Sequence, residues 1–158
     1  MGAVPEPGEG KRGLDGHLGY LLRQAANAHR LAMERALADL DVTPPQFTVM
    51  TMLAAYPGCS NADLARLSLL TPPTMTVIIG NLEKRGAISR QAHASHGRIR
   101  QIAVTPEGQQ LLDACRERVH ATEAHLAEGL SADEQNTVKR WLAQASRILT
   151  SGYAPDTL

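Results

Sequence analysis

The sequence predicts a mainly α-helical fold with one small β-hairpin. Hydrophobic residues make up 43% of the 158 residues and aromatic residues only 3%, so the core must consist of Leu, Ala, Val, Ile and Met, a composition that favours helices. A second observation is a series of helix starts at which Ser or Thr precedes proline or a capping partner. The length fits one domain with a substantial core.

The first helix is expected over residues 14–40. Its apolar positions follow alternating steps of four and three, the spacing of a packed helical seam, and are Leu14, Leu18, Leu21, Ala25, Ala28 and Ala32. Residues 1–12 are rich in Gly, Pro and charge and are interpreted as a mobile tail, with a second tail at 153–158.

Five further helices have marked starts. The capping residues are Thr43 with Gln46, Ser60 with Asp63, Thr71 with Pro72 and Pro73, Thr105 with Pro106, and Ser131 with Glu134. These signals predict helices near 44–55, 61–67, 72–85, 106–128 and 132–150. Between the fourth and fifth helices Ile88, Arg90 and Ala92 alternate with polar residues, as do Ile102 and Val104, which predicts a hairpin that turns near Gly97.

The positive charge is concentrated near this hairpin. The formal net charge of the chain is zero. Residues 83–100 nevertheless carry five cations against the single acid Glu83, a local charge of +4, the cations being Lys84, Arg85, Arg90, Arg98 and Arg100. A basic patch of this kind points to an anionic partner such as nucleic acid.

Three short helices followed by a basic hairpin are the order expected of a winged helix-turn-helix. Helix 61–67 is too short to stand alone and would brace helix 72–85 across a tight turn. The first turns of helix 72–85 would then face the major groove of double-stranded DNA, and the hairpin would reach the minor groove or its phosphates. The predicted DNA-contacting residues are Asn61, Thr71, Pro73, Thr74, Thr76, Asn81, Lys84, Arg90, Arg98 and Arg100. The threonines could instead act only as caps, and the basic hairpin could be only a solvated surface.

Four segments carry a resemblance to a known family. They are Thr43-Pro44-Pro45-Gln46-Phe47, Asn61-Ala62-Asp63-Leu64-Ala65, Asn81-Leu82-Glu83-Lys84-Arg85-Gly86 and Val104-Thr105-Pro106-Glu107-Gly108. In order and spacing they resemble the multiple antibiotic resistance regulator (MarR) family over residues 14–150. The resemblance implies a homodimeric transcriptional regulator, most often a repressor, that reads a near-palindromic DNA site.

The resemblance also implies a division of labour along the chain. Residues 13–42 and 106–152 would form the dimerisation helices, and residues 43–105 the winged helix-turn-helix domain. Relatives commonly bind phenolic or other aromatic compounds in a crevice beside the first two helices, so the candidate ligand residues are His17, Asn27 and Phe47. Each of these three could equally be core or surface.

The chain departs from the family pattern in and near the hairpin. His96 stands where an aspartate is usual, and Gly97 and Val77 stand where arginines are frequent. Fewer cations predict a shallower salt dependence of DNA binding. His93 and His96 lead to the hypothesis that mildly acidic pH tightens DNA binding.

Other function classes have weaker support. The histidines show no i, i+4 pair that would place two imidazoles on one helical face, so no metal site, cofactor or enzymatic reaction is expected. Cys59 and Cys115 form no CxxC motif, although the helix after Cys59 could lower its pKa and make it a redox sensor. A dimer that binds small molecules or proteins without DNA remains an alternative. No signal peptide or apolar run of about 20 residues is visible, and a cytoplasmic protein without membrane contact is expected.

Overall fold

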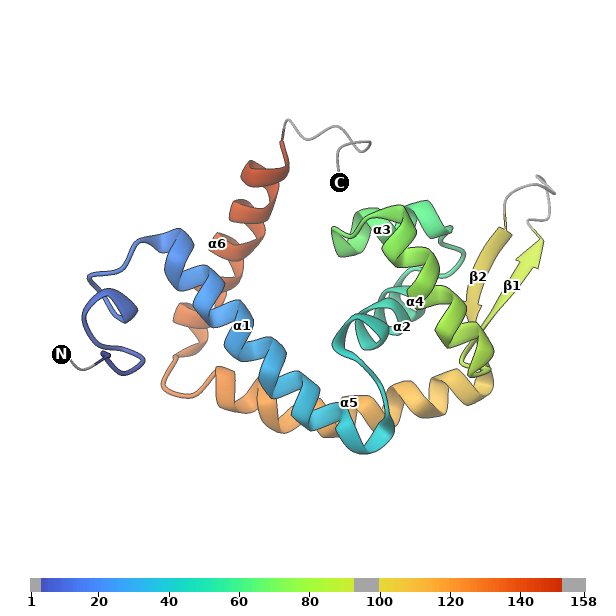
Figure 1. Ribbon diagram of the computed structural model, residues 1–158, viewed down its shortest axis with the longest axis horizontal. Coiled ribbons are helices and arrows are strands. Elements are labelled where there is room, and N and C mark those ends of the chain that lie inside the picture. The colour runs from blue at the N-terminus through green and yellow to red at the C-terminus, as the bar shows by residue number, and fades with distance from the viewer. Residues whose placement is uncertain (1–3, 93–99, 152–158) are drawn as a thin grey trace.

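The computed structural model describes residues 4–92 and 100–151 (Figure 1). In chain order the elements are η1 (Gly10–Arg12), α1 (Leu18–Leu37), η2 (Ala38–Leu40), α2 (Pro44–Ala55), α3 (Asn61–Ser68), α4 (Pro72–Lys84), β1 (Ile88–Ala92), β2 (Arg100–Val104), α5 (Pro106–Leu126) and α6 (Ala132–Thr150). Helices α2, α3 and α4 gather with the hairpin at one end, while α1 and α6 lie at the other. Helix α5 runs beneath both groups and joins them (Figure 1).

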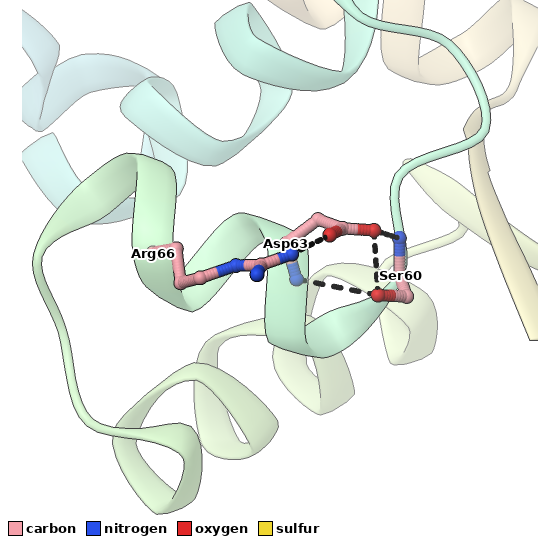
Figure 2. A network of polar contacts seen from close by, with 3 residues as sticks. All are labelled: Ser60, Asp63 and Arg66. Carbon is pink, nitrogen blue, oxygen red and sulfur yellow. Dashed lines mark hydrogen bonds and ion pairs between the residues drawn. The ribbon is translucent and has the colours of Figure 1, made fainter. Parts of the chain in front are cut away.

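The predicted helix caps are confirmed. The N-cap side chains of α2, α3, α4, α5 and α6 each accept a hydrogen bond from the backbone N–H three residues on. In α2, α3 and α6 the third residue reciprocates, which completes a capping box. Figure 2 shows this box at α3, where Asp63 accepts from both the backbone N–H and the hydroxyl of Ser60, at 2.9 and 2.7 Å, and also pairs with Arg66.

The predicted start of the first helix is wrong. Helix α1 begins at Leu18, and Leu14 lies outside it with a fully exposed side chain. Gly13 and Gly16 explain the difference, because each glycine costs a helix about 1 kcal/mol relative to alanine. Within the part of the chain that the structure describes, no side chain caps this start either. At its other end α1 tightens after Leu37 into the 3₁₀ turn η2.

The core lies where the end of α1 meets α2, α4 and α5. Its fully buried side chains are Leu37, Val49, Met50, Leu64, Met75, Ile79, Leu82, Ile102, Leu112 and Cys115. The predicted seam of α1 lies mostly outside this core, since Leu18, Ala25 and Ala28 are exposed. Helix α6 contributes no buried residue.

The hairpin strands pair antiparallel, with Ile88 opposite Val104 and Ala92 opposite Arg100. Ile88 and Ile102 are buried and fix the base of the hairpin against the helices. The backbone N–H of Ile102 also donates to the carbonyl of Cys59 at 3.1 Å. The predicted turn near Gly97 lies outside the described residues.

Two of the segments that carry the family resemblance meet at the start of α5. The Thr105 hydroxyl donates to the carbonyl of Gly86 at 2.5 Å, and its backbone N–H donates to the carbonyl of Ala87 at 3.0 Å. Gly108 lies directly on Ala87, so that a Cβ at position 108 would stand 1.8 Å from the Ala87 carbonyl oxygen. Only glycine fits here, and the joint fixes α5 to the end of the loop that follows α4.

Candidate nucleic-acid interface

A tight turn positions α4 against α3. Leu69 ends α3 in the left-handed conformation with φ 51°, and the backbone N–H of Leu70 donates to the carbonyl of Ala65 at 3.0 Å. Helix α4 then buries one face, formed by Met75, Ile78, Ile79 and Leu82. The short helix α3 therefore braces α4 as predicted, and the opposite face of α4 points to solvent.

The exposed face of α4 has a centre and two flanks. At about 100° per residue, Pro73, Val77, Gly80 and Lys84 lie near its centre. Thr74 and Asn81 lie on one flank and Thr76 on the other. Pro73, Thr74, Thr76, Asn81 and Lys84 are exposed, and Val77 exposes 63% of its surface. The predicted contact residues of α4 thus share one accessible surface. Val77, which was not among the predicted contacts, lies at its centre.

The hydroxyls of the first turn are paired with one another. Thr71 and Thr74 place their Oγ1 atoms 2.9 Å apart, and Thr71 Oγ1 also accepts from the backbone N–H of Thr74. Thr71 therefore caps α4, which is the alternative role that the sequence left open for the threonines. Thr74 remains exposed beside it.

Asn61 joins the first turn of α3 to α4. Its Nδ2 donates to Thr76 Oγ1 at 2.9 Å, and the same hydroxyl donates to the carbonyl of Pro72 at 2.9 Å. The predicted residues Asn61 and Thr76 are thus brought together, although they lie fifteen residues apart in the chain. The sequence pattern gave no signal for this contact.

The positive charge is partly engaged within the chain. Arg90 pairs with Glu83, its Nε lying 3.1 Å from Glu83 Oε2. Arg85 donates to the carbonyls of Leu40 and Asp41 at 2.5 Å each, and so holds the end of η2 instead of facing outward with α4. Composition alone could not separate this arginine from its neighbours.

The remaining cations near the hairpin lie at the edges of the surface. Lys84 and Arg100 are exposed, at the end of α4 and the start of β2. Arg90 and Arg100 share one face of the hairpin, since Arg90 lies opposite Ile102 and Arg100 opposite Ala92. The predicted contact Arg98 and the wing residues His93, His96 and Gly97 lie outside the described residues.

The expectation that the α3 N-terminus lowers the pKa of Cys59 is wrong. Burial, and then the negative charge of Asp63, raise the pKa of the Cys59 thiol above its usual value. Burial likewise raises the pKa of Cys115. Both effects reduce the thiolate fraction at neutral pH, and with it the reactivity toward oxidants.

The three candidate ligand residues are not gathered in one place within the chain. His17 is exposed at the start of α1, Asn27 is exposed about 15 Å further along the same helix, and Phe47 packs half-buried against the core. One groove is lined by Tyr56, Cys59, Asp63, Arg66 and Leu67, and a second by residues of α1 and α6 including Leu18 and Trp141. Neither of these two grooves contains any of the three residues.

Within 4–92 and 100–151, no group of three or more His, Cys, Asp or Glu side chains is placed to hold a metal ion. Across the same ranges, no helix combines the length and apolar character needed to cross a bilayer.

Comparison with known proteins gives a consistent result. The model of the MarR family matches residues 42–99. The chain is 36% identical to the HTH-type transcriptional repressor Rv2887 of Mycobacterium tuberculosis over 128 residues, which are 81% of this chain and 92% of that protein.

Solved structures agree over most of the chain. The transcriptional repressor CouR bound to a 23-mer DNA duplex has a TM-score of 0.78 at 26% identity, covering 91% of this chain and 99% of CouR. The Mycobacterium tuberculosis MarR family protein Rv2887 in complex with salicylic acid has a TM-score of 0.66 at 35% identity, covering 84% of this chain and 98% of that one. With four motifs in order, the capped helix-turn-helix and these relatives, the chain belongs to the MarR family.

Proposed function

We propose that this protein is a homodimeric transcriptional repressor that binds a near-palindromic double-stranded DNA site and releases it when a small aromatic ligand binds. The observation that carries the proposal is the exposed face of α4. Pro73, Thr74, Thr76, Val77 and Asn81 are exposed together on this face, and the helix packs against α3 and the core. An exposed helix of this kind, beside a basic hairpin, fits the major groove.

Dimerisation is supported by apolar surface that the single chain leaves uncovered. Helix α6 is 19 residues long and buries none of them, yet carries Trp141, Leu142, Ile148 and Leu149 with 41–65% of their surface exposed. Leu18 of α1 is 69% exposed beside them. Exposed apolar patches often mark association sites. We propose that a second copy of the chain covers this one, with residues 13–42 and 106–152 forming the dimer interface and residues 43–105 the DNA-binding domain.

Ligand control is supported by a relative. The similar protein Rv2887 is described in complex with salicylic acid. We propose that this protein also binds a small aromatic ligand, and that His17, Asn27 and Phe47 of either protomer are candidate contacts. Release of DNA follows if the ligand binds better to a dimer whose two α4 helices are wrongly spaced.

The proposed role is not enzymatic. The curated relative is a transcriptional repressor, and the proposed site consists of groups that bind and position DNA. Because a bacterial repressor meets its operator in the cytoplasm, we place the protein there.

The test begins with selection of bound fragments from the genome that encodes the protein. The recovered duplex is titrated with the wild-type protein and with Thr74→Ala and Arg100→Ala. We expect Thr74→Ala to lose affinity for the operator but not for random DNA, and Arg100→Ala to lose affinity for both alike. Equal behaviour of the two variants would contradict the assignment of α4 to base reading.

The oligomeric state is tested by sedimentation. The wild-type protein is expected to sediment as a dimer, and Leu142→Glu to shift it toward the monomer and weaken operator binding. A monomeric wild-type protein that still binds operator at full affinity would contradict the dimer. Salicylate added to the complex is expected to release the DNA.

A further inference from the structure

We infer that Asn61 fixes the Thr76 hydroxyl as a hydrogen-bond acceptor, so that Thr76 selects a base that carries an exocyclic amino group. The inference deepens the proposed function, because it assumes that α4 enters the major groove. It concerns which chemical group the flank of α4 beside α3 recognises there.

A threonine hydroxyl has one proton to donate and two lone pairs that accept. The proton of Thr76 is directed to the carbonyl of Pro72, at 2.9 Å. One lone pair accepts the Nδ2 proton of Asn61, also at 2.9 Å. What remains toward solvent is a single lone pair on an exposed residue. In this arrangement Thr76 therefore faces its partner as an acceptor.

Asn61 is what keeps the hydroxyl in this state. The bond to Pro72 is local to α4, and a free threonine could rotate its proton away from that carbonyl toward another acceptor. While the amide of Asn61 donates to the oxygen, the proton is excluded from that side, and the Pro72 carbonyl is the acceptor to which it is directed within the chain. Asn61 is thus a positioning residue for Thr76.

Asn61 makes this contact at a cost to itself. Its Oδ1 is buried and, among the described residues, accepts no hydrogen bond. Buried polar atoms without a partner are uncommon in folded proteins. The bond to Thr76 is thus the hydrogen bond that the Asn61 amide makes among the described residues.

The edges of the bases then decide the preference. In the major groove adenine N6 and cytosine N4 are donors, whereas guanine O6 and thymine O4 are acceptors. A lone pair that meets an amino group forms a hydrogen bond, and one that meets a keto oxygen is repelled. The Thr76 position should therefore prefer adenine or cytosine on the contacted strand over guanine or thymine.

The experiment deletes single amino groups from the DNA. In the operator recovered by genomic selection, each adenine is replaced in turn by purine and each cytosine by 2-pyrimidinone, and binding is measured with the wild-type protein and Thr76→Val. At one position in each half-site we expect deletion to weaken wild-type binding by about 2- to 10-fold, the usual effect of one hydrogen bond. The penalty should vanish in Thr76→Val, which keeps the shape of the side chain.

Asn61→Ala tests the positioning role. We expect it to reduce the same penalty and to weaken the preference against guanine or thymine at that position. Asn61→Ser serves where Asn61→Ala lowers the melting temperature. Thr74→Val is the matched control, because its hydroxyl pairs with Thr71 instead, and it should leave the Thr76-dependent penalty intact.

Three outcomes overturn the inference. In the first, no amino deletion is coupled to Thr76→Val, and in the second Asn61→Ala leaves the amino-deletion penalty at its wild-type size; either leaves the proposed function standing. In the third, the wild-type protein binds no duplex at all, which contradicts the proposed function and this assignment together.

Discussion

Val77 is an apolar side chain at the centre of the exposed face of α4, 63% exposed. A β-branched apolar group at this place suits the methyl group of thymine and adds no attraction to phosphate. Replacing it by a cation therefore changes how the protein holds DNA in general.

We expect Val77→Arg to bind random DNA more tightly and to lose discrimination. If the new guanidinium neutralises one phosphate, the plot of log affinity against log salt concentration steepens by about 0.9. Titrations at several salt concentrations measure this slope. Val77→Ala is the control and should keep the wild-type slope, and an unchanged slope for Val77→Arg would mean that position 77 faces away from the phosphates.

At the level of single residues, the sequence predicted which side chains are exposed to solvent better than it predicted their hydrogen-bond partners. The first turns of helix 72–85 were expected to face the major groove, and the structure exposes Thr74 and Thr76 while it buries Met75, Ile78 and Ile79. The bond from Asn61 to Thr76 could not be predicted, since it depends on how α3 crosses α4. The hydrogen bonds from Arg85 to the carbonyls of Leu40 and Asp41, more than forty residues away, could not be predicted for the same reason.

Among the helices, α4 contains a glycine that weakens it. Gly80 lies near the centre of the exposed face, and a Cβ there would meet nothing within 4 Å. Gly80→Ala should raise the free energy of unfolding by up to about 1 kcal/mol, which is a rise of about 2–4 °C in melting temperature for a protein of this size.

The same substitution should weaken operator binding several-fold, because the added methyl group lies on the surface that approaches the groove. Thermal melting and operator titration of one preparation measure both effects. A stabilised variant with unchanged affinity would place Gly80 outside the interface.

The capping box of α3 makes part of the stability depend on pH. The hydrogen bonds from Ser60, the backbone bond first, and the ion pair with Arg66 hold the pKa of Asp63 below its usual value. A carboxyl with a lowered pKa in the folded state stabilises the protein above its unfolded pKa of about 3.9, and this contribution is lost as pH falls through the folded value.

Asp63→Ala should therefore lower the free energy of unfolding by roughly 0.5–2 kcal/mol at neutral pH, the usual range for a lost cap. The difference from wild type should shrink below about pH 4. Urea unfolding at pH 7, 5 and 3.5 measures it. Asp113→Ala, on the exposed side of α5, is the control, and a pH-independent difference for Asp63→Ala would contradict the electrostatic origin.

Helix boundaries could be predicted wherever the signal was local. A Ser or Thr cap and its partner three residues on lie within one turn, so the starts of α2, α3, α4, α5 and α6 were placed correctly. The start of α1 was misplaced because Leu14 continues the apolar spacing although its side chain is fully exposed. Periodicity alone does not show where burial ends.

For the whole molecule, Arg85 connects the winged domain to the first helix. Its guanidinium donates to the carbonyls of Leu40 and Asp41 at the end of η2. Arg118 of α5 adds an ion pair with Asp39 in the same turn, at 2.9 Å. These contacts set how α1 is held relative to the domain that carries α4.

Arg85→Ala should lower the free energy of unfolding by about 1–3 kcal/mol, since both bonds have a charged donor. Arg85→Lys should lie between wild type and Arg85→Ala, because an ammonium lacks the planar fork that reaches two carbonyls. Urea unfolding at one fixed protein concentration measures the series, as the stability of a dimer depends on concentration. Equal midpoints for the three proteins would show that the contact contributes nothing.

The overall architecture was predicted, but the use of its surfaces was only partly predicted. The order of capped helices and hairpin is local information and identified the winged helix-turn-helix. The role of the apolar residues of α1 and α6 could be inferred only from the structure, because the single chain leaves Leu18, Trp141 and Leu149 exposed.

The close contact of Gly108 with the Ala87 carbonyl has a genetic consequence. Every single-nucleotide missense change in a glycine codon introduces a Cβ, and here that atom would overlap the backbone of Ala87. Selection in growing cells for loss of repression should therefore recover alleles at codon 108 repeatedly. Such alleles would be recessive and poor in protein yield, unlike alleles of α4 that still pair with wild-type subunits and interfere with them.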